Sequence, residues 1–473
     1  MNNLKLNRIT VALRGTAIFF DRWHWILLAL TAPFLLFPSP SRSLALFVVP
    51  GLWIVAWLAG REPLPRTPLN ATLLLMYLMV LVSTLVTFDI AFSLPKIAGL
   101  VLGIGVFFAF VRYGKTARGW WLSLITFVGV GSGIAAFALV GTKWAAKFSI
   151  LTPLTSRLAP RITGLPGVEE GLHPNQVAGG LVWVLLLIVV LLGTTIIRRR
   201  EWLAALGQRR GVTMAFVLAV STLLITSTFL LTQSRSGYIG FVIASIVILL
   251  IVLPSRWRWA FFGSIVVTIV LAAFFLWPSR PAILLGSAFG SNPAGEAGLS
   301  LDTLEGRMEL WSRAIYGIQD FPFTGMGLNT FRRVVHMLYP LFLIGPDVDI
   351  GHAHNEYLQA ALDLGIPGLI AFLALYIGAF WMLLAVWKAT RDSAGTWSSP
   401  AGSGFLTKAL VLGLGGGLLA HMVFSLTDAT ALGAKPGILF WMLLGLICGL
   451  FAQRRPRLSD QGASVERTAG ISA

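Results

Sequence analysis

The chain has 473 residues, of which 56% are hydrophobic and 12% are charged, and its formal net charge is +17. A soluble domain carries about 25% charged residues, so the composition excludes a cytosolic globular protein, a disordered chain and an ordinary nucleic-acid-binding protein. In a chain this apolar, an excess of Lys and Arg indicates membrane topology rather than nucleic-acid binding. The single cysteine, Cys448, excludes an intrachain disulfide.

Apolar stretches recur along almost the whole chain. A helix that crosses a bilayer needs about 20 mostly apolar residues, and twelve stretches approach or exceed that length. They cover 24–39, 43–60, 70–88, 97–112, 119–141, 175–197, 211–232, 237–253, 259–277, 366–387, 408–426 and 436–453. The first two are short and could instead form a hairpin-like pair. No small-residue cleavage site separates them, so we expect the first stretch to be retained rather than removed as a signal peptide. The sequence therefore predicts an all-α polytopic membrane protein with about 12 transmembrane helices.

Basic residues are divided unequally between alternate loops. With the N-terminus inside, the cytoplasmic segments hold 23 of the 36 Lys and Arg, and 9 of the other 13 lie in two long outside loops. Lys and Arg collect in short cytoplasmic loops, so both termini are predicted to be cytoplasmic. Transmembrane helices 1–9 would then lie in residues 1–277, and helices 10–12 would lie in residues 366–457. A cytoplasmic tail would follow in residues 458–473.

The two long outside loops, 142–174 and 278–365, are longer than connections require. The second contains most of the polar groups that suggest chemistry, and loops held by a rigid scaffold are where binding and catalytic residues concentrate. Within it, apolar residues recur with helical spacing, which predicts an amphipathic helix lying on the outer membrane face. These residues are Leu304, Met308, Trp311, Ile315 and Ile318.

Two clusters in the second loop could hold a metal or supply a base. His352, His354 and Glu356 alternate along the chain, which suits a metal site on a strand, although a helix that begins near Leu358 would scatter them. Asp347-x-Asp349 could likewise bind a divalent cation. In the other interpretation, one histidine is a general base, because its near-neutral pKa suits removal of a proton from a sugar hydroxyl.

Two arginines are placed where a phosphate could meet them. Arg235 lies between two apolar stretches, at the outer membrane boundary, with small polar neighbours and Gly237. Arg307 begins the amphipathic segment. Arginine binds phosphate through two parallel hydrogen bonds and keeps its charge, so either residue could hold a phosphate-bearing lipid headgroup. A snorkelling side chain at the interface is the alternative for Arg235.

A family resemblance follows from one spacing. His354-Asn355, then nine residues, then Gly365-Ile366 resembles the His-(Asn/Ser/Gln)-x9-Gly signature of the O-antigen ligase superfamily. That superfamily contains the lipopolysaccharide O-antigen ligases, the O-antigen and exopolysaccharide polymerases and related oligosaccharide transferases. Three further segments are similar: Arg161-Ile162-Thr163-Gly164, Pro174-Asn175-Gln176-Val177-Ala178 and Pro322-Phe323-Thr324-Gly325-Met326-Gly327.

The resemblance implies a metal-independent, GT-C-like glycosyltransferase of the bacterial inner membrane, with no cofactor and with loop 278–365 capping a cavity. Its donor would be a glycan on undecaprenyl diphosphate, presented at the periplasmic face. Arg235 and Arg307 match the arginines that hold the diphosphate, and His354 matches the histidine that activates the acceptor hydroxyl. Asn355 is expected to orient the loop or the histidine, and Glu356 to raise the basicity of His354. One base acting by direct attack predicts inversion at the anomeric carbon.

Alternatives remain open around this reading. Arg161 is a candidate for glycan or phosphate contact, and Asn175 either caps a helix or binds substrate. The acceptor could be a lipid A-core sugar, as for a ligase, or the growing glycan, as for a polymerase, and the compact single loop favours a ligase. A flippase of lipid-linked oligosaccharide and a cation-dependent transferase are further alternatives. The Gly413–Gly417 run indicates close helix packing rather than nucleotide binding.

Overall fold

The computed structural model describes residues 14–144, 151–158, 161–162, 164, 171–276, 304–345, 348–392, 403–433 and 435–453. Within these ranges the regular elements are helices, apart from one isolated β-bridge between Thr142 and Leu172. The predicted all-α class is therefore confirmed. The cytoplasmic tail predicted at 458–473 and the first part of the predicted loop 278–365 lie outside the described residues.

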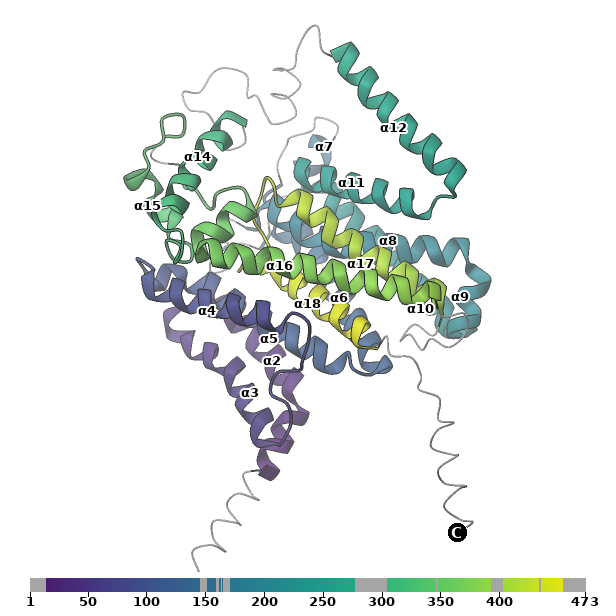
Figure 1. Cartoon of the computed structure of the whole chain (residues 1–473), viewed down its shortest axis with the longest axis horizontal. Helices are drawn as coiled ribbons and strands as arrows, with labels where there is room; N and C mark the ends of the chain where they lie inside the picture. The colour runs from purple at the N-terminus through teal and green to yellow at the C-terminus, as the bar shows by residue number, and fades with distance from the viewer. Residues whose placement is uncertain are drawn as a thin grey trace, which may run out of the picture.

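The helices form a long bundle (Figure 1). In chain order they are α2 His24–Leu36, η1 Pro40–Phe47, α3 Val48–Leu58, α4 Asn70–Val86, α5 Ile90–Tyr113, α6 Ala117–Gly141, α7 Thr152–Thr155, α8 Pro174–Ile197, α9 Arg199–Leu206, α10 Gln208–Leu231, α11 Arg235–Val252, α12 Ser255–Leu276, α14 Leu304–Asp320, α15 Phe331–Leu338, α16 Glu356–Asp392, α17 Gly404–Phe424, η2 Lys435–Gly437 and α18 Ile438–Ala452.

Each of the twelve predicted stretches falls on a helix. Nine helical segments among the described residues are long and apolar enough to cross a membrane, and α2 and α4 are shorter apolar helices. The chain is therefore a polytopic membrane protein. The predicted number of about 12 crossings is supported for nine segments by helix length and composition.

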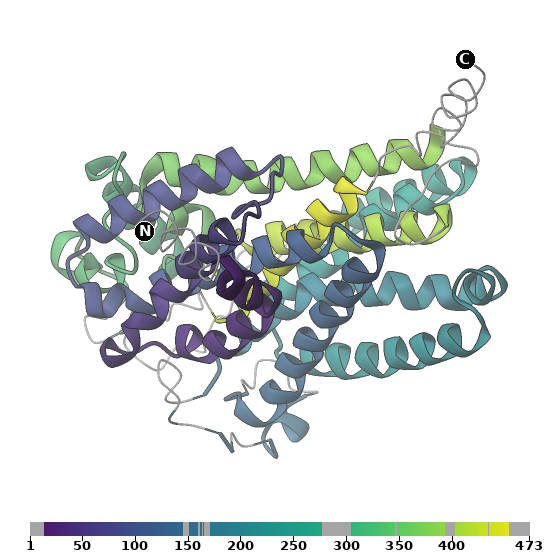
Figure 2. The same cartoon turned by 90° about the horizontal axis from the view of Figure 1, so that it is seen from below.

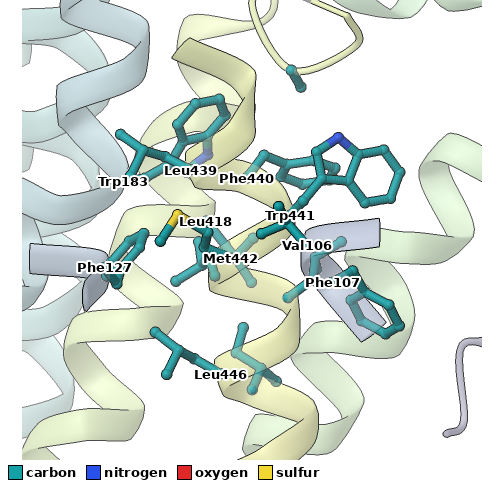
Figure 3. Close-up of a cluster of buried hydrophobic side chains, with 14 of the residues drawn as sticks. Val106, Phe107, Phe127, Trp183, Leu418, Leu439, Phe440, Trp441, Met442 and Leu446 are labelled. Atoms are coloured by element: carbon teal, nitrogen blue, oxygen red, sulfur yellow. The ribbon is translucent and has the colours of Figure 1, made fainter. Parts of the chain in front are cut away.

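Helix α8 forms the centre of the bundle. Almost every side chain from Val177 to Ile188 is buried, which matches a sequence that is apolar on all sides rather than on one stripe. Figure 3 shows part of the surrounding core, where Phe440 of α18 lies between Trp183 of α8 and Trp441. Helix α17 packs along α8 and α18 packs along α5.

Glycine allows the closest of these helix contacts. A Cβ atom at Gly417 of α17 would lie 2.5 Å from the carbonyl oxygen of Trp183, and one at Gly413 would lie 2.8 Å from the Cα atom of Leu187. A larger residue would push α17 away from α8. The prediction that the 413–417 glycines serve helix packing is confirmed.

The described part of the long loop forms a compact cap at one end of the bundle. Helices α14 and α15 and the start of α16 lie together there, opposite α9 (Figure 1), and α16 runs from that end along the molecule (Figure 2). The cap has its own apolar cluster, built around Leu310, Phe331, Val335, Ile350 and Leu362. Because Leu362 belongs to α16, this cluster fixes the cap to the bundle.

The apolar pattern of α14 is oriented differently from the prediction. Leu310 and Ala314 are fully buried in the cap, whereas Met308 is 58% exposed and Ile315 is 45% exposed. The buried residues are therefore not those of the predicted apolar stripe. Residues three or four apart share one face of a helix. The buried face of α14, with Leu310 and Ala314, lies one residue before the predicted stripe, and α14 packs against α16.

Helix α16 is broken at Gly365, where φ is +69°. The segment around Pro322 docks against this break, since the N–H of Ile366 donates to the carbonyl of Pro322 at 2.7 Å. A Cβ atom at Gly365 would lie 2.6 Å from the carbonyl oxygen of Phe323. Glycine is needed for both the left-handed backbone and the close approach. Two of the segments that carry the family resemblance therefore meet at this point.

Candidate active site

One loop organises the polar groups at the capped end of the bundle. Residues 425–432, which we call the hub loop, follow α17 and receive contacts from three other elements. The backbone N–H of Glu356 donates to the carbonyl of Ser425 at 2.9 Å, and the side-chain amide of Asn355 donates to the carbonyl of Leu426 at 3.0 Å. The start of α16 is thus attached to the hub loop.

Glu356 holds the hub loop from the other side. Its carboxylate, which is 1% exposed, accepts the backbone N–H groups of Thr430, Ala431 and Leu432. A buried carboxylate needs such donors to offset its lost hydration. Among the described residues, the hydrogen-bond partners of this carboxylate are these backbone amides and not His354, so the expectation that Glu356 raises the basicity of His354 stays a prediction.

Asn355 caps α16. Its side-chain oxygen accepts the backbone N–H groups of Tyr357 and Leu358, each at 3.0 Å, which is the usual arrangement at a helix N-terminus. The helix begins at Glu356, slightly earlier than the predicted start near Leu358. The side chain of Asn355 therefore fixes the start of α16 directly after His354.

His354 has an unusual backbone. Its φ is +46°, in the left-handed region that residues with a Cβ atom enter at a cost of about 1–2 kcal/mol. Its backbone N–H donates to Nδ1 of His352 at 3.0 Å, and the centroids of the two rings are 4.4 Å apart. Strained residues cluster at functional sites, and here the strain places two imidazoles side by side.

The hydrogen bond between these residues fixes the proton on His352. A neutral imidazole has one N–H, and Nδ1 of His352 accepts a hydrogen bond, so the proton must lie on Nε2. That atom is 3.3 Å from Oδ1 of Asp428, a buried residue of the hub loop. Among the described residues, Oδ2 of Asp428 and Nδ1 of His354 have no hydrogen-bond partner. A carboxylate and an unpaired imidazole nitrogen thus lie in one buried cluster.

The same cluster is the candidate metal site. Its ligand atoms on His352, His354 and Asp428 all lie within 4.8 Å of one another, so Asp428 replaces Glu356 in the predicted ligand set. Metal binding through Nε2 of His352 would require its proton to move to Nδ1. The hydrogen bond from the backbone N–H of His354 to Nδ1 would then be lost, because two donors would face each other. The arrangement as folded therefore favours a hydrogen-bonded cluster over metal coordination.

The second predicted cation pair is not assembled within the described residues. Asp347 lies outside them. The carboxylate of Asp349 faces the guanidinium of Arg332, with Nε of the arginine 2.7 Å from Oδ1. This ion pair uses the Asp349 oxygens that a cation would need.

Both histidines are neutral at physiological pH. Burial lowers the pKa of His354 to about 3, the interactions with His352 and with the Arg307 charge act in the same direction, and Asp428 opposes them. Burial likewise lowers the pKa of His352 to about 3, followed by the field of Lys96. Neutral imidazole is the form that can accept a proton.

The two arginines approach the hub loop from separate elements. Arg307, in the first turn of α14, is 6% exposed, and its Nη1 donates to the carbonyl of Thr427 at 3.0 Å. The hydroxyl of Thr427 donates to that of Ser236 at 2.6 Å. Ser236 directly follows Arg235, the half-buried first residue of α11. Arg307 and Ser236, the residue after Arg235, thus both bond to Thr427 of the hub loop.

The other two predicted site residues are less closely connected. Arg161 is exposed, and its backbone N–H donates to the carbonyl of Val140 at 2.7 Å. Asn175 is buried as the second residue of α8, but His173 is the N-cap, and its ring accepts the N–H of Asn175 at 3.3 Å. The capping interpretation of Asn175 is therefore wrong. His173 is among the smaller influences that lower the pKa values of His352 and His354, after burial.

Asp428 is the main residue to which the sequence assigns no role. The signal was present: an acidic residue beside an apolar span is expensive unless it has a function or a partner. His421 has a different position, because it is buried in the core, with Nδ1 2.9 Å from the Tyr376 hydroxyl and Nε2 2.9 Å from that of Thr430. It connects the hub loop to α16 and stacks on Trp183.

Fold and site together define a polytopic membrane protein with a buried histidine–arginine centre at one end of its helix bundle. A family model described as O-antigen ligase matches residues 220–373. Over that stretch, about a third of the chain, the resemblance to the O-antigen ligase superfamily is confirmed, and the chain is similar to membrane enzymes that assemble glycans. The stretch contains Arg235, Arg307 and His354. Among curated proteins no significant match is found.

Proposed function

We propose that this protein transfers a glycan from undecaprenyl diphosphate to an acceptor sugar hydroxyl at the periplasmic face of the bacterial inner membrane. The observation that carries the proposal is the convergence of Arg307, Ser236 beside Arg235, and the His352–Asp428 pair on the hub loop. The matched family stretch supports lipid-linked glycans as the class of substrate.

The arginines stabilise the leaving group. When the bond between the anomeric carbon and the diphosphate breaks, the electron pair and negative charge move to the diphosphate. Guanidinium groups placed there interact more strongly with the transition state than with the ground state, which lowers the barrier. Arg307 is held for this role by the Thr427 carbonyl, and Arg235 by its place at the start of α11.

His354 removes the proton of the acceptor. As the acceptor oxygen attacks the anomeric carbon, its proton passes to the neutral imidazole. The ring then carries a positive charge, and the Asp428 carboxylate in the same buried cluster stabilises it. A donor diphosphate in the site adds further negative charge, so substrate binding raises the pKa of His354 from its low value and makes the ring a stronger base.

The reaction is proposed to need no metal and to invert the anomeric configuration. The diphosphate is already an activated leaving group, and a single base with one attacking hydroxyl gives a one-step displacement. The acceptor is proposed to be a lipid A-core sugar, which makes the enzyme an O-antigen ligase. In the same proposal, both termini are cytoplasmic and the cap is periplasmic, over a cavity shared by donor and acceptor.

The test is an acceptor assay with purified protein and a lipid-linked glycan donor. Lipid A-core and a free glycan chain are offered in separate reactions, and products are separated by mass. Transfer to lipid A-core alone supports the ligase, and elongation of the glycan alone supports a polymerase with the same chemistry. Movement of donor across liposomes without any glycosylated product would contradict the proposed transferase.

A further inference from the structure

A polar cavity opens beside His352. It has a volume of about 400 Å³, and its walls come from α2, α5, α8, α15, the start of α16 and the segment after Asp428. Neither Arg235 nor Arg307 lines it. The volume lies in the range of about 300–1,000 Å³ that is typical of small-molecule sites. The cavity is therefore separate from Arg235 and Arg307, and it is lined by His352 of the histidine pair.

Three basic side chains from different elements face this cavity: Lys96 of α5, Arg332 of α15 and Lys435 of η2. The Nζ atom of Lys96 lies 2.6 Å from Oδ2 of Asp363. The guanidinium of Arg332 pairs with Asp349. An ammonium has three donors and a guanidinium has five, so Lys96 and Arg332 each keep donors beyond the ion pair that they form. An anionic ligand would meet charge-assisted donors on several sides.

Amide side chains and an apolar wall complete the lining. Gln176, Asn329 and Gln359 contribute amides, and Phe92 forms part of the wall. Several of these groups are held in place, since Gln359 donates to Asp363 at 2.8 Å and Asn329 donates to the carbonyl of Phe92 at 3.2 Å. A sugar ring offers hydroxyls to amides and a C–H face to an aromatic wall, so the lining suits a saccharide.

The position suits the second substrate of a transfer reaction. The proposed donor diphosphate would occupy the arginine side of the hub loop, so the acceptor hydroxyl must reach His354 by another route. His352 lines the cavity, and its ring centroid is 4.4 Å from that of His354, which is not among the lining residues. A saccharide in the cavity could present a hydroxyl toward the base without displacing the diphosphate.

We propose that this cavity is the acceptor subsite, and that it takes a saccharide carrying an anionic substituent, a phosphate or a carboxylate. The assignment rests on the proposed function for the direction of transfer. The recognition itself follows from the lining: cations for the substituent, amides for the hydroxyls and Phe92 for the ring. Free phosphate shares only the first of these features.

Binding of small probes tests the subsite without any turnover. Full-length protein in detergent is titrated with glucose 6-phosphate, glucuronic acid, glucose and inorganic phosphate, with ligand-observed NMR as the readout. The two anionic sugars are expected to bind at least ~5-fold more tightly than glucose and than phosphate. The double variant Arg332→Gln/Lys435→Gln is expected to lose that preference. Both side chains are partly exposed, so the changes should leave the fold intact.

Two controls make the outcome decisive. The double variant Arg256→Gln/Arg258→Gln removes two exposed charges from α12, outside the cavity, and should bind as the wild type does. Arg307→Gln should weaken binding of pyrophosphate but leave that of glucose 6-phosphate unchanged. The assignment is overturned if the Arg332/Lys435 variant keeps full sugar binding, if Arg307→Gln abolishes it, or if phosphate binds as well as the anionic sugars.

A transfer assay separates this inference from the proposed function. In that assay the Arg332/Lys435 variant should raise the KM for acceptor at least ~5-fold while the KM for donor stays the same. If no glycan is transferred by the wild type but the binding results hold, the proposed reaction fails and the saccharide subsite stands. If transfer occurs with an unchanged acceptor KM, the subsite fails and the reaction stands.

Discussion

His354 combines features that rarely occur together in one residue: a left-handed backbone, burial, and a ring nitrogen without a partner among the described residues. Each of these costs free energy in the folded state. A substrate proton can repay part of that cost, because a protonated ring gains the nearby Asp428 carboxylate. Burial opposes protonation of the ring and Asp428 favours it, so proton acceptance by His354 depends on that carboxylate and on the negative charge of the proposed substrate.

The low histidine pKa values predict an unusual pH profile. Because the pKa of His354 falls from 6.5 to about 3, the free enzyme keeps its neutral base as the pH drops through 6.5. The value of kcat/KM should therefore stay level from about pH 8 to about pH 5 and decline only nearer the folded pKa. The acid limb of kcat should lie higher, because bound diphosphate raises the pKa. An acid limb of kcat/KM centred near 6.5 would contradict the assignment.

The same shifts predict a loss of stability in acid. The unfolded chain takes up protons on His352 and His354 below about pH 6.5, whereas the folded chain does not until about pH 3. Stability is therefore complete above 6.5 and falls progressively between these values. Thermal unfolding of His352→Gln and wild-type protein at pH 7.5 and pH 5 measures this. The wild type should lose more stability than the variant between pH 7.5 and pH 5. Equal losses would show that folding does not lower the pKa of His352.

Arg307 should act on the transition state. Replacement by Gln is expected to lower kcat by about 10²–10³, as for other lost oxyanion donors, and replacement by Lys should restore only part of it because a point charge cannot form two parallel bonds. Steady-state kinetics with varied donor separate kcat from KM. Arg313→Gln, on the same helix but bonded to the Pro340 carbonyl, should stay near wild type. A rise in donor KM with unchanged kcat would show that Arg307 only binds substrate.

At the scale of elements, the hub loop is the part that unites the site. Its carboxylate partner Glu356 lies 74–76 residues away in sequence from the amides it accepts. It ties α16 to the connection that follows α17, so a change in this contact should move Asp428 and Thr427 together. The loop thus couples the histidine pair to the arginines.

Replacing Glu356 tests this coupling. In Glu356→Gln one of the two accepting oxygens becomes an NH2 group, which leaves at least one buried N–H without an acceptor and should cost about 1–3 kcal/mol. Both the unfolding temperature and kcat should fall. Glu305→Gln, an exposed change in the first turn of α14, is the matched control. Wild-type stability in Glu356→Gln would mean that the hub loop does not depend on this carboxylate.

Elements and site were predictable to different extents. Hydropathy predicts the twelve apolar helices because the apolar residues of each helix are consecutive in the sequence. Gly365, part of the motif that carries the family resemblance, lies at the break in α16. The position of Arg307 at the start of α14 was also foreseeable from its amphipathic surroundings. The pairing of His352 with Asp428 was not, because it joins the end of the cap to a loop 76 positions later. The hydrogen bonds from backbone amides to Glu356 were not predictable either, because backbone donors leave no pattern in the sequence of side chains.

At the scale of the whole molecule, the site lies at one end of the bundle, and basic residues such as Arg198 lie at the other, near α9 (Figure 1). Labelling with a membrane-impermeant maleimide in a Cys448→Ser background tests the predicted orientation. Met337→Cys, on the exposed surface of the cap, should react in intact spheroplasts. Gln208→Cys, exposed at the opposite end, should react only after lysis. The reverse pattern would place the site on the cytoplasmic side.

The central claim is that the histidine–arginine centre itself moves a glycan without metal. Transfer by wild-type protein in EDTA, followed beside His354→Ala with the same donor and acceptor, measures it most directly. The account predicts that the wild type keeps its rate and forms a product of inverted configuration. His354→Ala should lose at least about 10²-fold in rate while still binding the lipid diphosphate. Wild-type turnover by His354→Ala, or activity lost in EDTA and restored by a divalent cation, would contradict the account.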